Sequence, residues 1–252
     1  ERHEAEMIAR EIVELQKGTE YIDYNNFVIL YRTNAQSRVL EEVFLRYGIP
    51  YRIVGGIKFY QRKEIKDIVA YLRLIQNPND SVSLLRVINT PTRKIGAKTL
   101  EVLQEFATKN NLSLFKAMLL VNEIKELQEA KSEAINSFIK LIKELQELSG
   151  EYRASGMIKQ ILDRSGYKKM LDDGSVEGEA RLENTAELIS VAHKYDELEP
   201  GISLNIFLEE ISLIADIDSM DEKDNAVTMM TVHSAKGLEF PNVFIAGLEE
   251  GI

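Results

Sequence analysis

Residues 26–56 read NFVILYRTNAQSRVLEEVFLRYGIPYRIVGG, and they indicate the fold class of the chain. The apolar run at 26–31 is typical of a strand buried in a parallel sheet. Apolar residues at helical spacing follow over 34–47, with Asn34 as a candidate helix cap. Residues 51–54 form a second β-rich run. A strand, a helix and a strand joined by short links predict a βαβ unit.

The strand signal stops after this unit and returns only near the end of the chain. Every clear segment within 61–224 has helical periodicity, and strand-like runs reappear at 226–232 and 242–246. We therefore expect an α/β fold in which residues 1–60 and 225–252 build a parallel sheet and an all-helical segment is inserted between them. The inserted helices are expected near 65–75, 80–88, 97–109, 113–121, 123–149, 154–165, 178–195 and 203–214.

The longest of these segments, 123–149, allows two interpretations. Apolar residues recur every seven positions at Leu127, Ala134, Leu141 and Leu148, the spacing of a coiled-coil seam. Lys131 interrupts the second seam position, and the run is shorter than four heptads. A coiled-coil arm and a long helix packed within a bundle both fit this pattern.

The composition is that of a globular protein, with 44% apolar and 29% charged residues among 252. The chain has no cysteine, which excludes disulfides and thiolate zinc sites, and its three histidines are far apart. No apolar run is long enough to span a membrane and no leader is visible, so we expect a cytoplasmic protein with neither a membrane partner nor a metal site. The net charge of −10 argues against a DNA-coating protein, although local basic patches can still bind phosphate.

The chain begins at Glu1 without a methionine and ends after an apolar run, so we interpret it as a piece of a longer protein. It lacks the loop GxxxxGK[ST] that holds nucleotide phosphates, and it lacks GxSxG. Its carboxylates are scattered over amphipathic helices, where a solvated face is the usual interpretation. We therefore expect no catalytic residue in this piece and no enzymatic activity of the piece alone.

The segment 231–240, TVHSAKGLEF, directly follows a predicted strand, so its polar groups emerge at the carboxyl edge of the sheet. Open α/β sheets bind ligands at that edge. His233 and Lys236 can donate to phosphate, and Glu239 can accept from ribose hydroxyls. A capped turn with incidental charges explains the same residues, and their spacing does not decide between the two interpretations.

The residues that end the first predicted strand offer a similar set of groups. Arg32 presents forked donors to phosphate, Asn34 can pair with a base edge, and Tyr31 provides a stacking face. The alternative is that Tyr31 belongs to the core and Asn34 only caps the helix. From the residues alone, nucleic-acid contact and ordinary packing both remain open.

The segment 89–100, NTPTRKIGAKTL, is basic within an acidic chain. It carries Arg93, Lys94 and Lys98 and no acidic residue. Gly96 stands at the predicted start of a helix, where free N–H groups and the helix dipole favour an anion. A grip on duplex phosphates without sequence preference fits these features, and a plain turn between helices fits as well.

Five strings of the chain carry a family resemblance. They are FVILYRTNAQSRVLEE (27–42), PYRIVGGIKFYQRKEIKDIVAYLRL (50–74), NTPTRKIGAKTL (89–100), ARLEN (180–184) and MMTVHSAKGLEFPNVFIAGLEEGI (229–252). In this order they resemble the C-terminal motor half of superfamily 1 DNA helicases of the UvrD/Rep/PcrA family, and they cover nearly the whole chain. The part TVHSAKGLEFPNVF resembles the family's motif V and is the most specific of them.

The resemblance implies a RecA-like domain of the P-loop NTPase type, called 2A, at 1–60 and 225–252. It also implies a large inserted all-α domain, called 2B, at 61–224. The resemblance further implies that the piece belongs to an ATP-dependent DNA helicase that moves 3′ to 5′ and unwinds duplex DNA in repair and replication. It implies ATP and Mg²⁺ as the cofactors of the whole protein. The family's Walker motifs lie upstream and its last arginine-bearing motif lies beyond Ile252, so the piece is expected to bind neither cofactor alone.

The partners that the resemblance implies are single-stranded and duplex DNA and the upstream motor domain of the same chain. Repair, replication or RNA polymerase proteins are further candidates. Two other functions are compatible with the chain. One is a nuclease-linked recombination helicase, which shares motif V but differs in its insertion. The other is a non-catalytic helical module for protein docking or autoinhibition.

The resemblance also implies roles for individual residues. The residues implied to touch single-stranded DNA are Tyr31, Arg32, Asn34 and His233. Glu239 would contact the nucleotide ribose, and the loop that couples nucleotide to DNA would contain Thr231, Lys236 and Gly237. The residues implied to bind duplex DNA are Thr92, Arg93, Lys94, Ile95, Gly96 and Lys98. The family usually has glycine at the position of Lys94, a change that restricts one close backbone contact and adds a charge.

Overall fold

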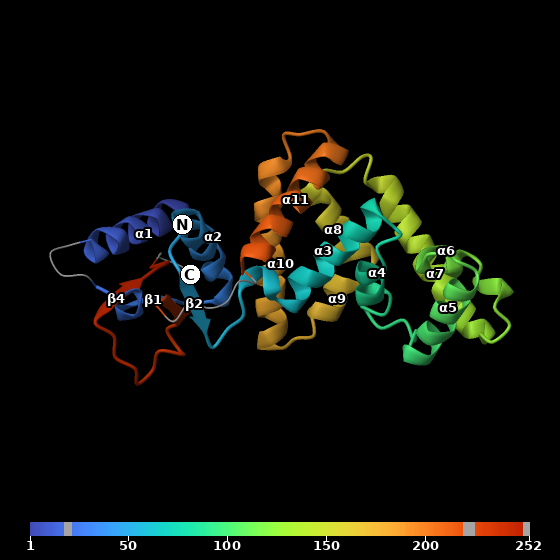
Figure 1. Ribbon diagram of the computed structural model, residues 1–252, viewed down its shortest axis with the longest axis horizontal. Helices are drawn as coiled ribbons and strands as arrows, with labels where there is room; N and C mark the ends of the chain where they lie inside the picture. Colours follow the sequence, from blue (N-terminus) through green and yellow to red (C-terminus); the bar gives the residue numbers. More distant parts are fainter. Residues whose placement is uncertain (18–21, 219–224, 249–252) are drawn as a thin grey trace. The chain divides into compact units, whose positions relative to one another are not determined.

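The structure is a computed structural model, and it describes residues 1–17, 22–218 and 225–248. Its regular elements are helices and strands that pair only in parallel (Figure 1). The fold class is therefore α/β, as the sequence predicts. No helix within these three ranges is both long and apolar enough to cross a lipid bilayer.

The chain forms two compact units. The first, here called the α/β unit, consists of residues Glu1–Arg62 and Ser212–Ile252. The second, the helical unit, consists of residues Lys63–Ile211, so it lies in sequence between the two parts of the first. The junction expected near residue 224 lies outside the described residues.

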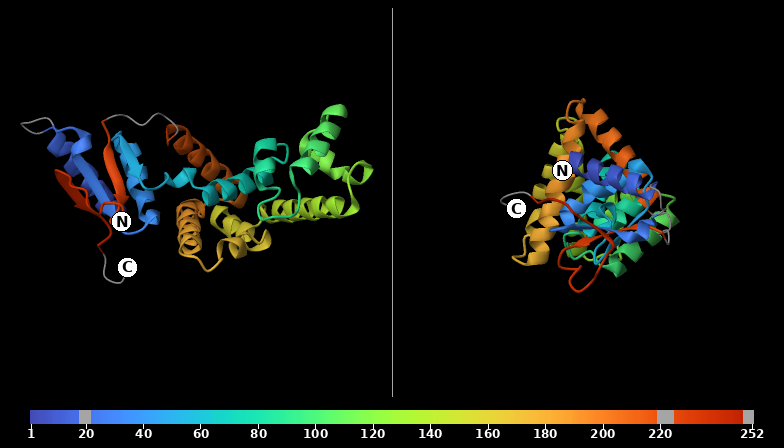
Figure 2. Two further views of the ribbon diagram at one scale, coloured as in Figure 1. Left: turned by 90° about the horizontal axis from the view of Figure 1, so that it is seen from below. Right: turned by 90° about the vertical axis from the view of Figure 1, so that its left-hand side faces the viewer.

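The α/β unit contains a four-stranded parallel sheet with the order β2-β3-β1-β4. The strands are β1 (Phe27–Tyr31), β2 (Tyr51–Val54), β3 (Val227–Thr231) and β4 (Asn242–Ile245). Strands β1 and β3 lie side by side, although most of the chain separates them in sequence (Figures 1 and 2). The expected strand-helix-strand unit forms, but β3 lies between its two strands.

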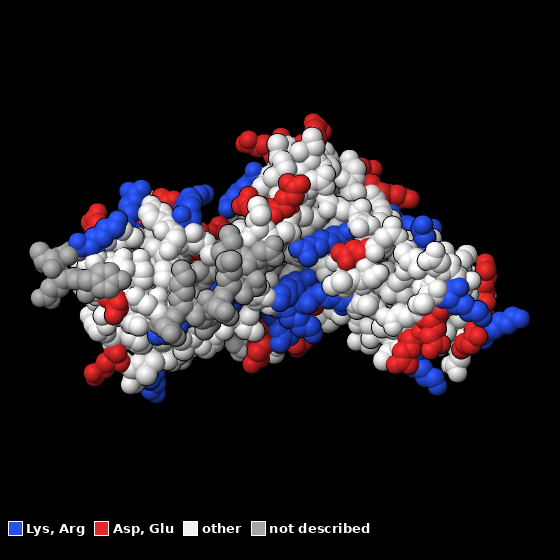
Figure 3. Space-filling view, viewed as in Figure 1, with Lys and Arg blue, Asp and Glu red and all other residues white. Residues whose placement is uncertain are grey.

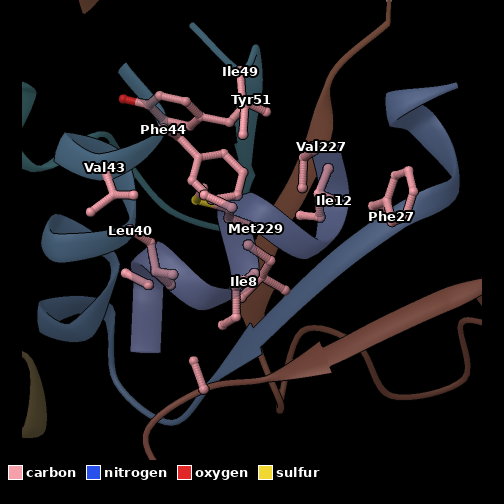
Figure 4. Close-up of a cluster of buried hydrophobic side chains, with 14 of the residues drawn as sticks. Ile8, Ile12, Phe27, Leu40, Val43, Phe44, Ile49, Tyr51, Val227 and Met229 are labelled. Atoms are coloured by element: carbon pink, nitrogen blue, oxygen red, sulfur yellow. The ribbon is translucent and has the colours of Figure 1, made fainter. Parts of the chain in front are cut away.

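Helices α1 (Arg2–Gln16) and α2 (Ser37–Tyr47) cover one face of this sheet. The apolar side of α1 packs with α2 and with alternate residues of β1 and β3, and Figure 4 shows the resulting cluster. Each large aliphatic side chain buried in this way contributes about 1.5–3 kcal/mol. Helix α2 ends at Tyr47 and is followed by Gly48, whose φ of 68° is the left-handed conformation that closes many helices.

The helical unit contains no strand among its residues, all of which the structure describes. Its helices are α3 (Lys63–Gln76), α4 (Ser81–Val87), α5 (Ala97–Lys109), α6 (Leu114–Leu119), α7 (Glu129–Leu148), α8 (Ala154–Arg164), α9 (Tyr167–Leu171), α10 (Val176–Ala192) and the start of α11 (Pro200–Asp218). The helix predicted at 97–109 is confirmed as α5. The short helix α9 was not predicted, because five residues carry too little periodicity.

The helix predicted over 123–149 is shorter than expected. A short 3-10 turn ends at Glu123, and α7 begins only at Glu129, because Ile124 and Gln128 adopt extended backbone angles. The buried stripe of α7 is Ile135, Phe138, Ile139, Ile142 and Leu145 rather than the seven-residue series. Since α7 packs against α3, α6 and α8, the bundle interpretation is correct and a coiled-coil arm is not needed.

Buried polar residues tie the first helix of the helical unit to its neighbours. Glu64 on α3 is 5% exposed and accepts a hydrogen bond of 2.6 Å from the Asn184 amide on α10. Asp67 accepts from the Tyr167 hydroxyl at 2.7 Å and pairs with Arg86 at 2.7 Å. Burial, reinforced by the bond to Asp67, raises the pKa of the Tyr167 phenol. The string ARLEN therefore supplies a structural contact through Asn184.

We predict that Asn184→Ala lowers the free energy of unfolding by about 1–3 kcal/mol, because it removes the amide that donates to a buried carboxylate. Urea unfolding followed by helical circular dichroism measures the change. The control is Glu183→Ala at the exposed neighbouring position, which should change stability by less than about 0.5 kcal/mol. Equal effects of the two substitutions would contradict the structural role.

Candidate functional site

The carboxyl ends of β1 and β3 place two polar loops side by side in the α/β unit. Tyr31 and Thr231 are paired in the strand register, and the Val232 amide donates to the Tyr31 carbonyl at 2.9 Å. The loop after β1 (residues 32–36) and the loop after β3 (residues 232–239) therefore start from adjacent positions. We call them the β1 loop and the β3 loop.

The β1 loop is held by its own side chains. The Gln36 side-chain oxygen accepts from the amides of Arg32 at 2.9 Å and Thr33 at 3.1 Å. In return, the Thr33 side chain accepts from the Gln36 amide, so the two residues form a capping box. This cap leaves the Arg32 side chain exposed to solvent. Asn34 is half-buried within a short 3-10 turn, and α2 begins three residues later at Ser37, so Asn34 is not the cap of α2.

Tyr31 does not have the position that its predicted role requires. Its side chain is 0% exposed and belongs to the core between the sheet and its covering helices. Burial raises the pKa of its phenol, and the negative charge of Glu41 adds to this effect while Arg62 opposes it. A buried ring has no face on which a base can stack, so this conformation fits the interpretation of Tyr31 as a core residue and does not fit stacking.

The β3 loop turns tightly and presents several charged groups. The Thr231 hydroxyl bonds to the Ser234 hydroxyl at 2.9 Å and accepts from the Ser234 amide at 3.2 Å. His233, Lys236 and Glu239 are all exposed beyond this turn. Gly237 has a φ of 83°, a conformation that L side chains rarely adopt. The sequence-predicted residues of this loop are therefore available to a ligand.

A pair of glycines after β2 brings the two loops into contact with a third segment. A Cβ atom added to Gly55 would lie 2.8 Å from the Ser234 hydroxyl oxygen of the β3 loop. One added to Gly56 would lie 3.3 Å from the Asn34 side-chain oxygen of the β1 loop. The backbone of residues 55–56 thus approaches both loops, and this approach leaves little room for a side chain at Gly55.

The third candidate segment, 89–98, belongs to the helical unit and is organised by Asn89. The Asn89 side-chain oxygen accepts from the amides of Arg93 at 2.7 Å and Ile95 at 3.3 Å. The Ile95 side chain is 1% exposed, so it anchors the segment from inside. The predicted place of Ile95 near duplex phosphates stays a prediction, and with the side chain buried it applies to the Ile95 backbone.

Arg93 is also used internally. Its guanidinium donates to the carbonyls of Val87 at 3.0 Å, Ile88 at 3.1 Å and Pro91 at 3.1 Å. It also donates to the Tyr71 hydroxyl at 2.8 Å and lies 5.1 Å above the centre of the Phe138 ring. With so many donors engaged, Arg93 fixes the shape of the segment, and its predicted role as a direct phosphate ligand does not fit this arrangement.

Four predicted residues of the same segment face solvent, namely Thr92, Lys94, Gly96 and Lys98. Gly96 precedes α5, and no side chain caps this helix, so its first amides are free to bind an anion. The Lys131 ammonium donates to the Lys94 carbonyl at 2.6 Å. The sequence did not identify Lys131 as part of this site, because it lies 37 positions after Lys94 and no local pattern links the two residues.

The described residues suggest no metal centre. Within residues 1–17, 22–218 and 225–248, no group of three or more His, Asp or Glu side chains is arranged to hold a metal ion. Figure 3 shows that Lys and Arg side chains gather on the visible face of the helical unit, although the whole chain has a net charge of −10. The groups that the candidate segments expose, namely basic side chains and the free amides at the start of α5, are suited to anions and hydrogen-bonding groups.

Comparisons with known proteins agree with this chemistry. The family model described as UvrD-like helicase C-terminal domain matches residues 1–252. The chain is 48% identical over 255 residues to ATP-dependent DNA helicase PcrA of Staphylococcus epidermidis and 46% identical over the same length to ATP-dependent DNA helicase PcrA of Staphylococcus aureus. Each alignment covers 100% of this chain and 34% of the relative, so the chain spans about a third of their length.

We predict that Lys94→Gly raises the free energy of unfolding by about 0.5–1 kcal/mol, because Lys94 has a φ of 62° and side chains strain that conformation. Urea unfolding measures the change. Asn111→Gly is the matched control: Asn111 has a φ of 52° and asparagine tolerates this region well, so a smaller gain is expected. If Lys94→Gly instead lowers the free energy of unfolding, the lysine side chain contributes more stability than its left-handed backbone conformation costs.

Proposed function

This chain belongs to the family of UvrD-like helicase C-terminal domains, and we propose that it is the second motor half of an ATP-dependent DNA helicase that moves 3′ to 5′. The names of the relatives support the helicase activity, and the expected family is confirmed. In this proposal the α/β unit is most of the RecA-like domain 2A, and the helical unit is the inserted domain 2B. The whole protein acts in repair and replication in the cytoplasm.

One observation carries the proposal, namely the adjacent β1 and β3 loops at the carboxyl edge of the sheet. Arg32 and His233 are exposed on loops that start from paired strand ends. In this proposal the two side chains contact the backbone of one DNA strand, together with Asn34 of the β1 loop. Since phosphate contacts dominate such binding, it should tolerate any sequence and weaken as salt rises.

The β3 loop also suits a coupling role between DNA and nucleotide. Its exposed Glu239 carboxylate is able to accept hydrogen bonds from ribose hydroxyls, while the exposed His233 on the same loop is free to contact DNA. Thr231 and Gly237 set the shape of the loop, and Lys236 adds a donor. ATP with Mg²⁺ supplies the phosphoryl group that is transferred to water, and the groups that assemble around it belong to the rest of the protein.

The segment 89–98 suits the phosphates of duplex DNA. Lys94 and Lys98 flank the uncapped start of α5, where backbone amides and the helix dipole attract anions. Thr92 and Gly96 are exposed beside them. Arg93 and Ile95 contribute by holding the segment in shape. The helicase as a whole would thereby grip the duplex ahead of the single strand.

We predict that Arg32→Ala and His233→Ala in the whole protein each weaken binding of a fluorescent oligo-dT about tenfold, because each removes a charged or hydrogen-bonding contact to the strand. Fluorescence anisotropy measures the dissociation constant. Unwinding of a duplex with a 3′ tail should fall in parallel, and a 5′-tailed duplex should not be unwound. The control is Arg46→Ala, an exposed residue of α2 paired with Glu6 at 2.9 Å. Unchanged strand binding in both variants would refute the proposal.

For the duplex segment, Lys98→Ala should weaken duplex binding equally for all sequences and reduce the slope of log affinity against log salt by about 0.9. Titrations at several salt concentrations measure the slope. Lys109→Ala, at the exposed far end of the same helix, should leave the slope unchanged. Equal slopes in the two variants would argue against a phosphate contact at Lys98.

A further inference from the structure

Arg62 is a buried charged residue at the point where the chain leaves the α/β unit for α3. It is 6% exposed and follows the short 3-10 turn Phe59–Gln61. Neither the strand contacts nor the nucleotide contacts proposed above use it. Its surroundings nevertheless lead directly to the β1 loop.

The Arg62 guanidinium is engaged on several sides. One terminal nitrogen donates to the Asn34 carbonyl at 2.8 Å and to the Ser37 hydroxyl at 2.9 Å. The Nε atom donates to the Ile57 carbonyl at 3.1 Å, and the group lies 5.1 Å from the centre of the Phe59 ring. The planar fork therefore joins the β1 loop, the first turn of α2 and the segment that precedes α3.

Glu41 completes this cluster from α2. It is 2% exposed, accepts from the Ser37 hydroxyl at 2.5 Å, and accepts from the Phe59 amide at 3.0 Å. The Arg62 and Glu41 side chains lie 3.9 Å apart at their nearest charged atoms. Ser37 thus connects the two charges. Arg62 binds the carbonyls of Ile57 and Asn34, and Glu41 binds the Phe59 amide.

Stability alone does not account for such a cluster, because burying a charged pair costs about as much free energy as the pair returns. What the geometry provides is a defined position for the β1 loop. The Arg32 and Thr33 amides are fixed by Gln36 on one side, and the Asn34 carbonyl is fixed by Arg62 on the other. The exposed Arg32 side chain therefore projects from a backbone held at both ends.

The same segment also approaches the β3 loop. Because Gly55 and Gly56 have no side chains, their backbone lies close to Ser234 and Asn34. Six residues after Gly56, Arg62 donates to the Asn34 carbonyl. Residues 55–62 therefore contact both loops that we assign to single-stranded DNA. They continue without a break into α3, which starts at Lys63.

We propose that Arg62 is a positioning residue for single-strand binding, which holds the β1 loop in the conformation that presents Arg32 to the strand. The inference rests on the proposed function, because it assumes that Arg32 contacts DNA. Arg62 itself touches no ligand in this account. Its effect passes through the Asn34 carbonyl, and a lysine cannot replace the planar fork that makes these bonds together.

The test uses the whole protein and the oligo-dT anisotropy assay with a double-mutant cycle. Arg62→Lys should weaken strand binding about fivefold, and the same change in an Arg32→Ala background should have less than about a twofold effect, because both act through one contact. The control is Arg38→Lys. Arg38 is also 6% exposed and pairs with Glu42 at 2.6 Å on the same helix. It should change strand binding by less than about twofold in either background.

Thermal unfolding of each variant shows whether the fold is intact. If Arg62→Lys does not fold, Ser37→Ala removes a single hydroxyl of the cluster and should weaken binding in the same direction by a smaller factor, again only when Arg32 is present. Equal effects of Arg62→Lys with and without Arg32, or an effect no larger than that of Arg38→Lys, would overturn the inference. If Arg32→Ala itself leaves strand binding unchanged, the proposed function fails instead.

Discussion

The parallel pairing of β1 with β3 is the constraint on which the rest of the α/β unit depends. It joins strands that are separated in sequence by the entire helical unit. An insertion of this length is tolerated because the entropy of closing a loop rises only slowly with its length, by about 0.6 kcal/mol per doubling. The pairing sets Tyr31 opposite Thr231, so the two loops that follow begin at neighbouring positions.

Within each binding segment, the structure divides the polar residues between two tasks. Some face solvent, such as Arg32, His233 and Lys98, and others hold the backbone that presents them. Arg93 donates to the Pro91 carbonyl of its own segment and to the Val87 and Ile88 carbonyls just before it. Arg62 donates to the Asn34 carbonyl. This division has a physical cause: irregular backbone that is partly buried must find hydrogen-bond partners, and arginine supplies several donors at once.

Net charge says little about where this protein could bind anions. The chain carries a formal charge of −10, yet its candidate sites are a pair of loops with exposed basic groups and an uncapped helix start flanked by lysines. Screening confines the influence of distant acidic groups to about 8–10 Å at physiological salt. Local geometry therefore decides where an anion can bind.

The sequence by itself determined most of the elements, since the periodicity of apolar residues is a local property. The strand-helix-strand unit, helix α5 and the late strands were all predictable, whereas α9 and the start of α7 were not. The motifs also identified which loops carry polar groups. Only the tertiary structure decided that β3 lies between β1 and β2 and that Tyr31 and Ile95 are buried. It also decided that Lys131 reaches the segment 89–98 and that Arg62 reaches the β1 loop. These outcomes depend on contacts between residues far apart in the chain, which no local pattern encodes.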